Sequence, residues 1–207
     1  MLDLDSSPIS SIDEADAVRD ALATRVHSAL EGQTNGAPRV VRVQVDLPRP
    51  VDPLAWLRGQ GREAAAYWSA RNQTTAVGTL GAADVVASTD RPLEYDRLRR
   101  QLGRRLQQAE ASVRYYGGLR FDATYPKADN GLKAPWEAFG TYRFVLPRFE
   151  LHAREEGTVL ACNLVFPRDH EREERLTEQI RTLVLPEEDL PVALPDPLGR
   201  NDVPDRQ

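Results

Sequence analysis

The chain has 207 residues, of which 41% are hydrophobic and 29% charged, and this balance excludes wholesale disorder. The single cysteine, Cys162, excludes a disulfide framework and argues against a multi-thiolate metal centre. The three histidines argue against a His-rich metal centre. The net charge of −5 disfavours nucleic-acid binding through general electrostatics.

The sequence also bears on location and on catalytic chemistry. No apolar run approaches the length of a membrane span, and the acidic N-terminus (MLDLDSSPISS) does not resemble a secretory signal. We therefore expect a cytoplasmic protein that does not bind membranes. Lys127 and Lys133 are the only lysines among 27 basic residues, so a lysine base would have to be one of these two.

The first half of the chain predicts two helices and three strands. Ser11 and Glu14 form a capping-box pattern, and a helix follows that stops near Gly32. Its apolar stripe is small and rich in alanine, so we expect residues 1–37 to form a partly mobile helical extension. The domain proper then begins with a half-buried strand (39–47), a short helical turn (54–57) and a hairpin (64–70 and 75–80).

The second half predicts helices at both ends and strands between them. A helix opens at Pro92 with an apolar stripe from Tyr95 to Ala109. A strand at 113–121 and a long loop at 122–139, which holds both lysines, come next. The strand at 142–151 changes phase at Pro147, which indicates a bulge or a sheet edge, and Glu155-Glu156-Gly157 then turns the chain.

Two segments complete the expected domain, which runs from residue 38 to residue 184. The run 159–166 is nearly all apolar, as in a strand covered on both faces. A final helix has Asp169 as its expected cap and four expected buried positions: Leu176, Ile180, Leu183 and Val184. The fold class is therefore α+β, a mainly antiparallel sheet with flanking helices. Residues 185–207 are rich in proline, lack periodicity and are expected to form a linker.

The candidate functional residues each have a simpler structural interpretation that we favour. His170 and Glu174 have a metal-ligand spacing, but charged neighbours favour a solvated helix start. We expect His152 to be a hydrogen-bonded strand residue and not a base. We expect Cys162 to be a buried, inert thiol. An arginine cluster is interpreted as a solvated helix face, although it could contact phosphate or a carboxylate: Arg97, Arg99, Arg100, Arg104 and Arg105.

Gly117-Gly118, inside an expected strand, is the most distinctive local signal. Paired glycines in a strand imply close approach of another backbone or, as a minority interpretation, of a ligand. Neither a dinucleotide-binding nor a P-loop pattern is present. The residues alone therefore assemble no catalytic set, no cofactor site and no metal site.

Three blocks of sequence, taken together, resemble one known family. They are Tyr116–Asp122 (YGGLRFD), Trp136–Gly140 (WEAFG) and Arg143–Leu151 (RFVLPRFEL). Their order and spacing resemble the N-terminal half of isochorismate synthases, within the chorismate-utilising enzymes that include anthranilate and aminodeoxychorismate synthases. Tyr67-Trp68, Gly81–Asp84 and Pro195–Asp205 also resemble that family, the last of them its linker before the chorismate-binding domain.

The resemblance implies that the chain has the N-terminal part of the anthranilate synthase-like fold. It also implies that the chain is part of an enzyme for menaquinone or siderophore supply. Family members convert chorismate to isochorismate with Mg²⁺, a lysine base, a glutamic acid and metal-binding glutamates. The resemblance places those residues in a C-terminal domain that we expect beyond Gln207, so no catalytic residue is transferred here, and neither Lys127 nor Lys133 matches the family base. We expect this chain alone to be inactive, to bind no Mg²⁺ and to have the chorismate-binding domain as its partner.

Two other interpretations remain open at this point. The chain could be a stand-alone small-molecule-binding or regulatory module derived from a chorismate-utilising enzyme. It could also belong to a related enzyme with a different product, such as salicylate synthase.

Overall fold

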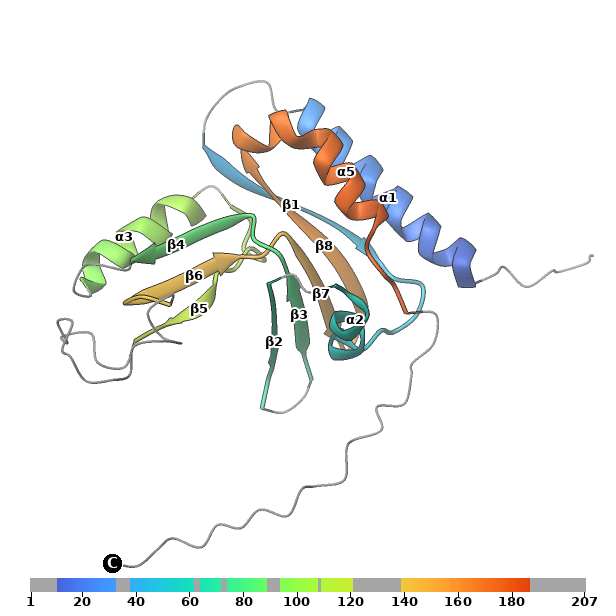
Figure 1. The fold of residues 1–207 in the computed structure, drawn as a ribbon, viewed down its shortest axis with the longest axis horizontal. Coiled ribbons are helices and arrows are strands. Elements are labelled where there is room, and N and C mark those ends of the chain that lie inside the picture. Colours follow the sequence, from blue (N-terminus) through green and yellow to red (C-terminus); the bar gives the residue numbers. More distant parts are fainter. Residues whose placement is uncertain are drawn as a thin grey trace, which may run out of the picture.

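The computed structural model contains two antiparallel sheets and their flanking helices (Figure 1). It describes residues 11–32, 38–61, 64–71, 74–88, 94–107, 109–120 and 139–186. The elements are α1 (Ser11–Glu31), β1 (Arg39–Asp46), α2 (Pro53–Gly59), β2 (Ala65–Ser69), β3 (Ala76–Leu80), β4 (Asp84–Ser88), α3 (Tyr95–Leu106), β5 (Tyr116–Leu119), β6 (Tyr142–Leu146), β7 (Phe149–Arg154), β8 (Gly157–Phe166), the 3₁₀ helix η1 (Arg168–Arg172) and α5 (Glu173–Arg181). This arrangement confirms the α+β class, and no described helix is long and apolar enough to cross a membrane.

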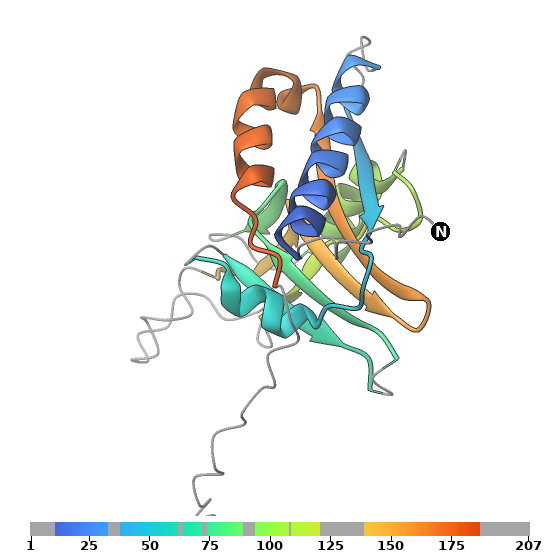
Figure 2. The ribbon, with the colours of Figure 1, turned by 90° about the vertical axis from the view of Figure 1, so that its right-hand side faces the viewer.

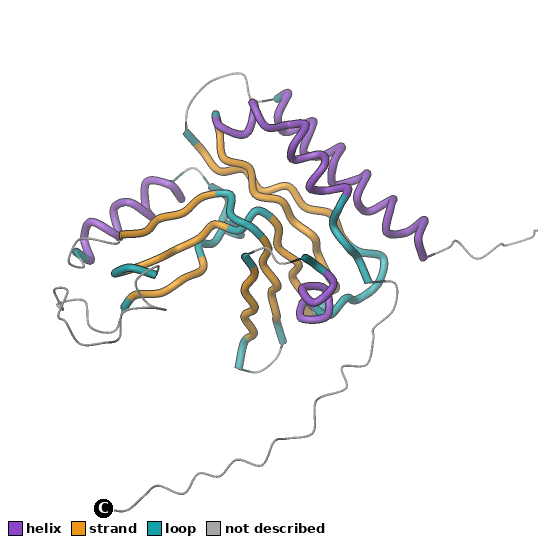
Figure 3. The backbone as a smooth tube through the Cα atoms, viewed as in Figure 1, coloured by secondary structure: helices purple, strands orange, loops and turns teal. Residues whose placement is uncertain are grey.

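The larger sheet has the strand order β1-β8-β7-β3-β2, and the smaller sheet has the order β4-β6-β5. Helices α1 and α5 run in opposite directions across one face of the larger sheet, and α2 covers the same face near β3 (Figures 1 and 2). Helix α3 accompanies the smaller sheet, as the helix and strand colouring of Figure 3 makes plain. The predicted hairpin is confirmed, because β2 and β3 pair directly.

The main core lies between the larger sheet and its helices. Strand β8 supplies its centre, and residues 158–164 are all buried, which confirms the strand expected to be covered on both faces. Leu22 of α1, Trp56 of α2 and Ile180 of α5 are fully buried against this strand and its neighbours. Helix α2 is capped by Asp52, whose carboxylate accepts hydrogen bonds from the Leu54 and Ala55 amides.

Helix α1 is part of this core, which differs from the small stripe expected for it. Val18, Leu22, Val26 and Leu30 are all buried, and Leu30 extends the stripe beyond the alanines. Because these side chains cover the sheet, α1 shares one hydrophobic core with residues 38–184. The side chain of Ser11 lies outside the described residues, and so do the loop lysines and the segment 187–207.

The phase change at Pro147 is where the chain leaves one sheet for the other. Strand β6 pairs in the smaller sheet and β7 in the larger one. Leu146 and Phe149 therefore belong to different hydrophobic clusters, which explains the break without a bulge inside a single strand. A second crossing joins β3 to β4 at Gly81, whose φ of 64° lies in the region that favours glycine.

Three expectations about helix residues were wrong. Asp169 does not cap α5, because its carboxylate is used inside the fold as described below. Val184 is 47% exposed, since the chain beyond α5 buries Leu183 and Leu185 on its other side. Tyr95, the first residue of α3, is exposed and stays outside the cluster that Leu98 and Leu102 join.

Candidate functional site

A buried polar cluster lies on the face of the larger sheet opposite α1 and α5. Arg42 of β1 and Asn163 of β8 are register partners, and Glu150 of β7 lies beside them. The Glu150 Oε1 atom is 2.9 Å from Arg42 Nη1 and accepts a hydrogen bond of 2.5 Å from Asn163 Nδ2. The side chains of Arg42 and Glu150 are both completely buried, so the pair is shielded from solvent.

The second oxygen of Glu150 binds two further groups. His152 Nε2 lies 2.6 Å from Oε2, and the Tyr116 hydroxyl donates to the same atom at 3.4 Å. Burial opposes ionisation of Glu150, but the His152 hydrogen bond and the Arg42 charge outweigh it and lower the carboxyl pKa. Burial and the nearby Glu150 raise the pKa of Tyr116 to about 12. Glu150 is therefore held as an anionic acceptor within the fold.

A second buried ion pair joins the sheet crossing to η1. Arg148 lies between β6 and β7 and donates to both oxygens of Asp169, at 2.7 and 3.1 Å. Asp169 also accepts from the Val165 amide at 2.7 Å, and Arg148 donates to the Asn163 carbonyl at 2.7 Å. Asn163 thus connects the two ion pairs into one network.

Part of this network has unused hydrogen-bonding capacity. Within the described residues, Arg42 Nη2 and Asn163 Oδ1 have no hydrogen-bond partner. Arg42 Nη1 is within ion-pair distance of Glu150 but does not have hydrogen-bond geometry. The arrangement can hold strands in register and orient donors, but its carboxylate is sealed by protein.

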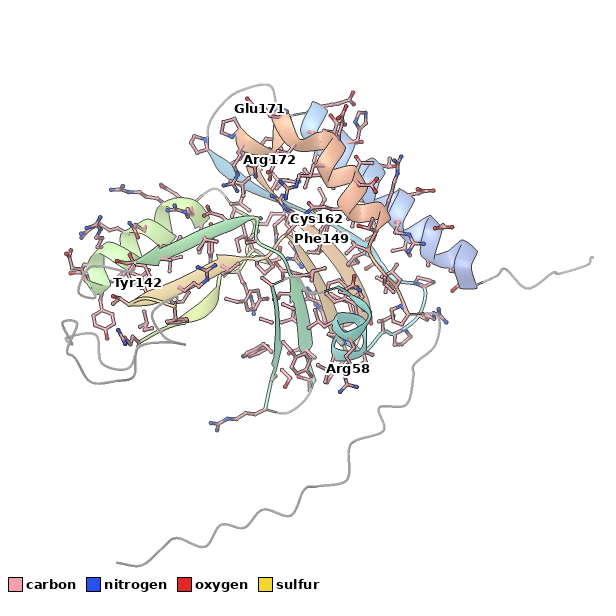
Figure 4. All side chains as sticks on the ribbon, in the orientation of Figure 1. Arg58, Tyr142, Phe149, Cys162, Glu171 and Arg172 are labelled. Carbon is pink, nitrogen blue, oxygen red and sulfur yellow. The ribbon has the colours of Figure 1, made fainter. Side chains whose placement is uncertain are left out.

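Three sequence interpretations are confirmed at their residues. His152 is a hydrogen-bonded strand residue, as expected. Burial raises the pKa of the Cys162 thiol to about 12, so it is inert in the folded chain (Figure 4 labels it within the sheet). A Cβ at Gly117 would lie 2.7 Å from the Phe144 Cα, so the absence of a side chain here allows β6 to pack closely against β5. A Cβ at Gly118 would contact only the Phe139 ring, at 3.7 Å.

The remaining candidates are not brought together into a site. His170 is exposed, with its ring edge-on to Phe166 at 5.1 Å, and the described part of the chain contains no cluster of three His, Cys, Asp or Glu side chains that could hold a metal. On α3, Arg105 pairs with Asp84 at 2.7 Å, and the arginine cluster otherwise forms a largely solvated face.

Sequence analysis missed Glu150, Arg42, Arg148 and Asp169 as a connected group. The local sequence carried no signal for this group, because Glu150 alternates with Phe149 and Leu151 as an outward-facing residue of a half-buried strand would.

Comparisons with known proteins give a consistent result. A family model described as "Chorismate binding enzyme" matches residues 24–195. Isochorismate synthase 2, chloroplastic, of Arabidopsis thaliana is 23% identical over 184 residues, which cover 79% of this chain and 32% of that protein. Isochorismate synthase MenF of Haemophilus influenzae is 27% identical over 140 residues, which cover 68% of this chain and 25% of that protein.

A solved structure has the same fold. The menaquinone-specific isochorismate synthase MenF of Escherichia coli matches with a TM-score of 0.53 and 20% identity, over 80% of this chain and 34% of that one. This chain therefore spans between a quarter and about a third of the length of these relatives.

Proposed function

The chain belongs to the chorismate-binding enzyme family, and from this we propose that it is the N-terminal part of an isochorismate synthase and is inactive alone. One observation carries the proposal: residues 24–195 match the family, yet the chain spans at most about a third of the relatives' length. Since the resemblance assigns the lysine base and the glutamic acid to the remainder, this part has a structural role.

The buried network supports the absence of catalysis by this part. A general base must reach a substrate proton within hydrogen-bond distance, directly or through one water. Glu150 is 0% exposed, and its oxygens are already bound by Asn163 and His152. Its neighbour Arg42 gives the cluster a compensating positive charge, which also makes it a poor Mg²⁺ site. We therefore assign Mg²⁺ to the complete enzyme.

Strand β2 supports a further contact with the rest of an enzyme. Among the described strands it is one of the two edges of the larger sheet, and all five of its residues are exposed. Tyr67 and Trp68 are 44% and 51% exposed. An apolar, unpaired edge is a template for another strand. The chorismate-binding domain is the partner that we propose for this edge.

The pathway proposal rests on the relatives. Both MenF proteins are isochorismate synthases, and the Escherichia coli enzyme is menaquinone-specific. We propose menaquinone supply as the role of the complete enzyme, with siderophore supply as the alternative, and a cytoplasmic location for both.

The test is an isochorismate synthase assay of the purified 207-residue chain with chorismate and Mg²⁺. We expect no turnover by the chain alone, and turnover after it is combined with a second chain that carries the catalytic domain. Trp68→Glu should weaken this complementation. Tyr95→Glu, which changes an exposed aromatic on α3, is the matched control and should not. Turnover by the chain alone would refute its inactivity, and complementation that Trp68→Glu leaves intact would refute the role of β2.

A further inference from the structure

A pocket of about 280 Å³ lies where the two sheets diverge, and it is separate from the Arg42–Glu150 pair. Its walls come from both crossings between the sheets and from the last helix. Arg148 stands in the β6–β7 crossing, Gly81 and Ala82 in the β3–β4 crossing, and the Arg148 amide donates to the Gly81 carbonyl. Junctions between layers are common places for ligand pockets.

Helix α5 and the residue before it give this pocket a positive wall. Arg172, Arg175, Leu176 and Gln179 line it, and their spacing of i, i+3, i+4 and i+7 is that of one helical face. Figure 4 labels Arg172 beside the start of α5. Both arginines are exposed, and neither forms an ion pair with a described residue.

Two acidic groups nearby are bound elsewhere. Among the described residues, none of those that line the pocket is acidic. Asp169 is fully buried and bound to Arg148, while Glu173 is bound to His27 of α1. The charge of Arg148 is thus balanced, whereas those of Arg172 and Arg175 have no partner among the described residues.

We propose that this pocket binds a small oxyanion, a molecule whose carboxylate or phosphate group is held by Arg172 and Arg175. Guanidinium groups match the geometry of both anions through paired N–H donors. Arg148 is fixed by Asp169 and forms a rigid part of the wall, and the Gln179 amide adds a neutral polar group. This site gives a location to the small-molecule-binding role that the sequence leaves open, and it does not depend on chorismate turnover.

Calorimetry on the 207-residue chain at low ionic strength tests the proposal. Malonate and inorganic phosphate are the two probes, and they distinguish a carboxylate from a phosphate ligand. We expect saturable binding of at least one, weakened about tenfold or more by Arg172→Gln or Arg175→Gln, because each removes a charge-assisted contact. Arg181→Gln is the matched control, since Arg181 is an exposed arginine of α5 that does not line the pocket.

Two further measurements complete the design. Ala82→Asp places a carboxylate at the pocket wall and should abolish binding while both arginines remain. Thermal unfolding of each variant verifies that it is folded. Absence of saturable binding by both probes, or an equal loss in Arg181→Gln, would overturn the proposal.

Discussion

Replacing Glu150 with glutamine should destabilise the fold strongly. Glutamine has nearly the same shape and keeps an oxygen that can accept from Asn163, so the substitution removes mainly the negative charge. Arg42 then stays in the interior with no carboxylate beside it, and its Nη2 atom already has no hydrogen-bond partner among the described residues. A buried charge that loses its partner is among the costliest changes a protein can undergo.

The expected loss is about 3–5 kcal/mol of unfolding free energy, the range for breaking a buried pair by removing one partner. Both side chains of the Arg42–Glu150 pair are 0% exposed, so solvent does not screen the remaining charge. For a chain of this size, the same loss lowers the melting temperature by roughly 6–20 °C. It is a large share of the total stability of about 5–15 kcal/mol that domains possess.

Urea unfolding followed by circular dichroism and by tryptophan fluorescence measures this effect. Glu174→Gln removes one negative charge from an exposed position of α5 and should change stability by less than about 0.5 kcal/mol. The double variant Arg42→Met with Glu150→Gln should recover most of the loss, because the uncompensated cation is gone. A loss below about 1 kcal/mol in the single variant, or no recovery in the double variant, would refute the argument.

The same pair predicts a pH dependence. The folded-state pKa of Glu150 lies below its ordinary value of 4.5, so its ionised form stabilises the folded chain. This contribution is present above that ordinary value and is lost as the pH falls through the lower, folded-state pKa. Melting temperatures across the acidic range should therefore fall less steeply for Glu150→Gln than for the unmodified chain, and parallel curves would contradict the assignment.

Other predictions concern single positions. Cys162 should not react with a thiol reagent until the chain unfolds, and rapid labelling of the native chain would contradict its burial. The hydrogen bond that His27 donates to Glu173, followed by the charge of Glu31, raises the pKa of His27 above 6.5. Any stabilisation from this pair is therefore present below pH 6.5 and lost as the pH rises through the raised pKa. An NMR titration should show the raised pKa of His27, and Glu173→Gln should shift it back towards 6.5. Gly117→Ala should cost about 1–3 kcal/mol in urea unfolding through its clash with β6, and Gly118→Ala, with only a 3.7 Å contact, should cost less.

Local sequence patterns predicted most of the helices and strands, because each of these patterns involves residues that are close together in the chain. The apolar run of β8, the turn between β2 and β3, and the helical spacing in α5 are all local patterns. The phase change at Pro147 was also visible, because side-chain alternation must break where a strand leaves its sheet. The family resemblance, carried by three blocks, was confirmed by the match over residues 24–195.

The polar network and the pocket could not be predicted in the same way. Arg42 and Glu150 come from strands that are far apart in the sequence and have β8 between them in the sheet. A charged residue in a strand signals solvent until its partner is known. The pocket likewise combines α5 with two separate crossings, and no single window of sequence contains all three.

The buried charges also follow from the backbone of this fold. A chain that passes between sheets leaves peptide groups without partners in either ladder, and buried peptide groups must be paired. Side chains of the network meet this need: Arg148 donates to the Asn163 carbonyl, Asn163 donates to the Pro147 carbonyl, and Asp169 accepts from the Val165 amide. Arg148 and Asp169 balance each other's charge while they do so, at 2.7 and 3.1 Å. Their burial is therefore explained by the crossing itself, whereas Arg172 and Arg175 are exposed, pair with no described backbone group or carboxylate, and stay available to the anion that we propose.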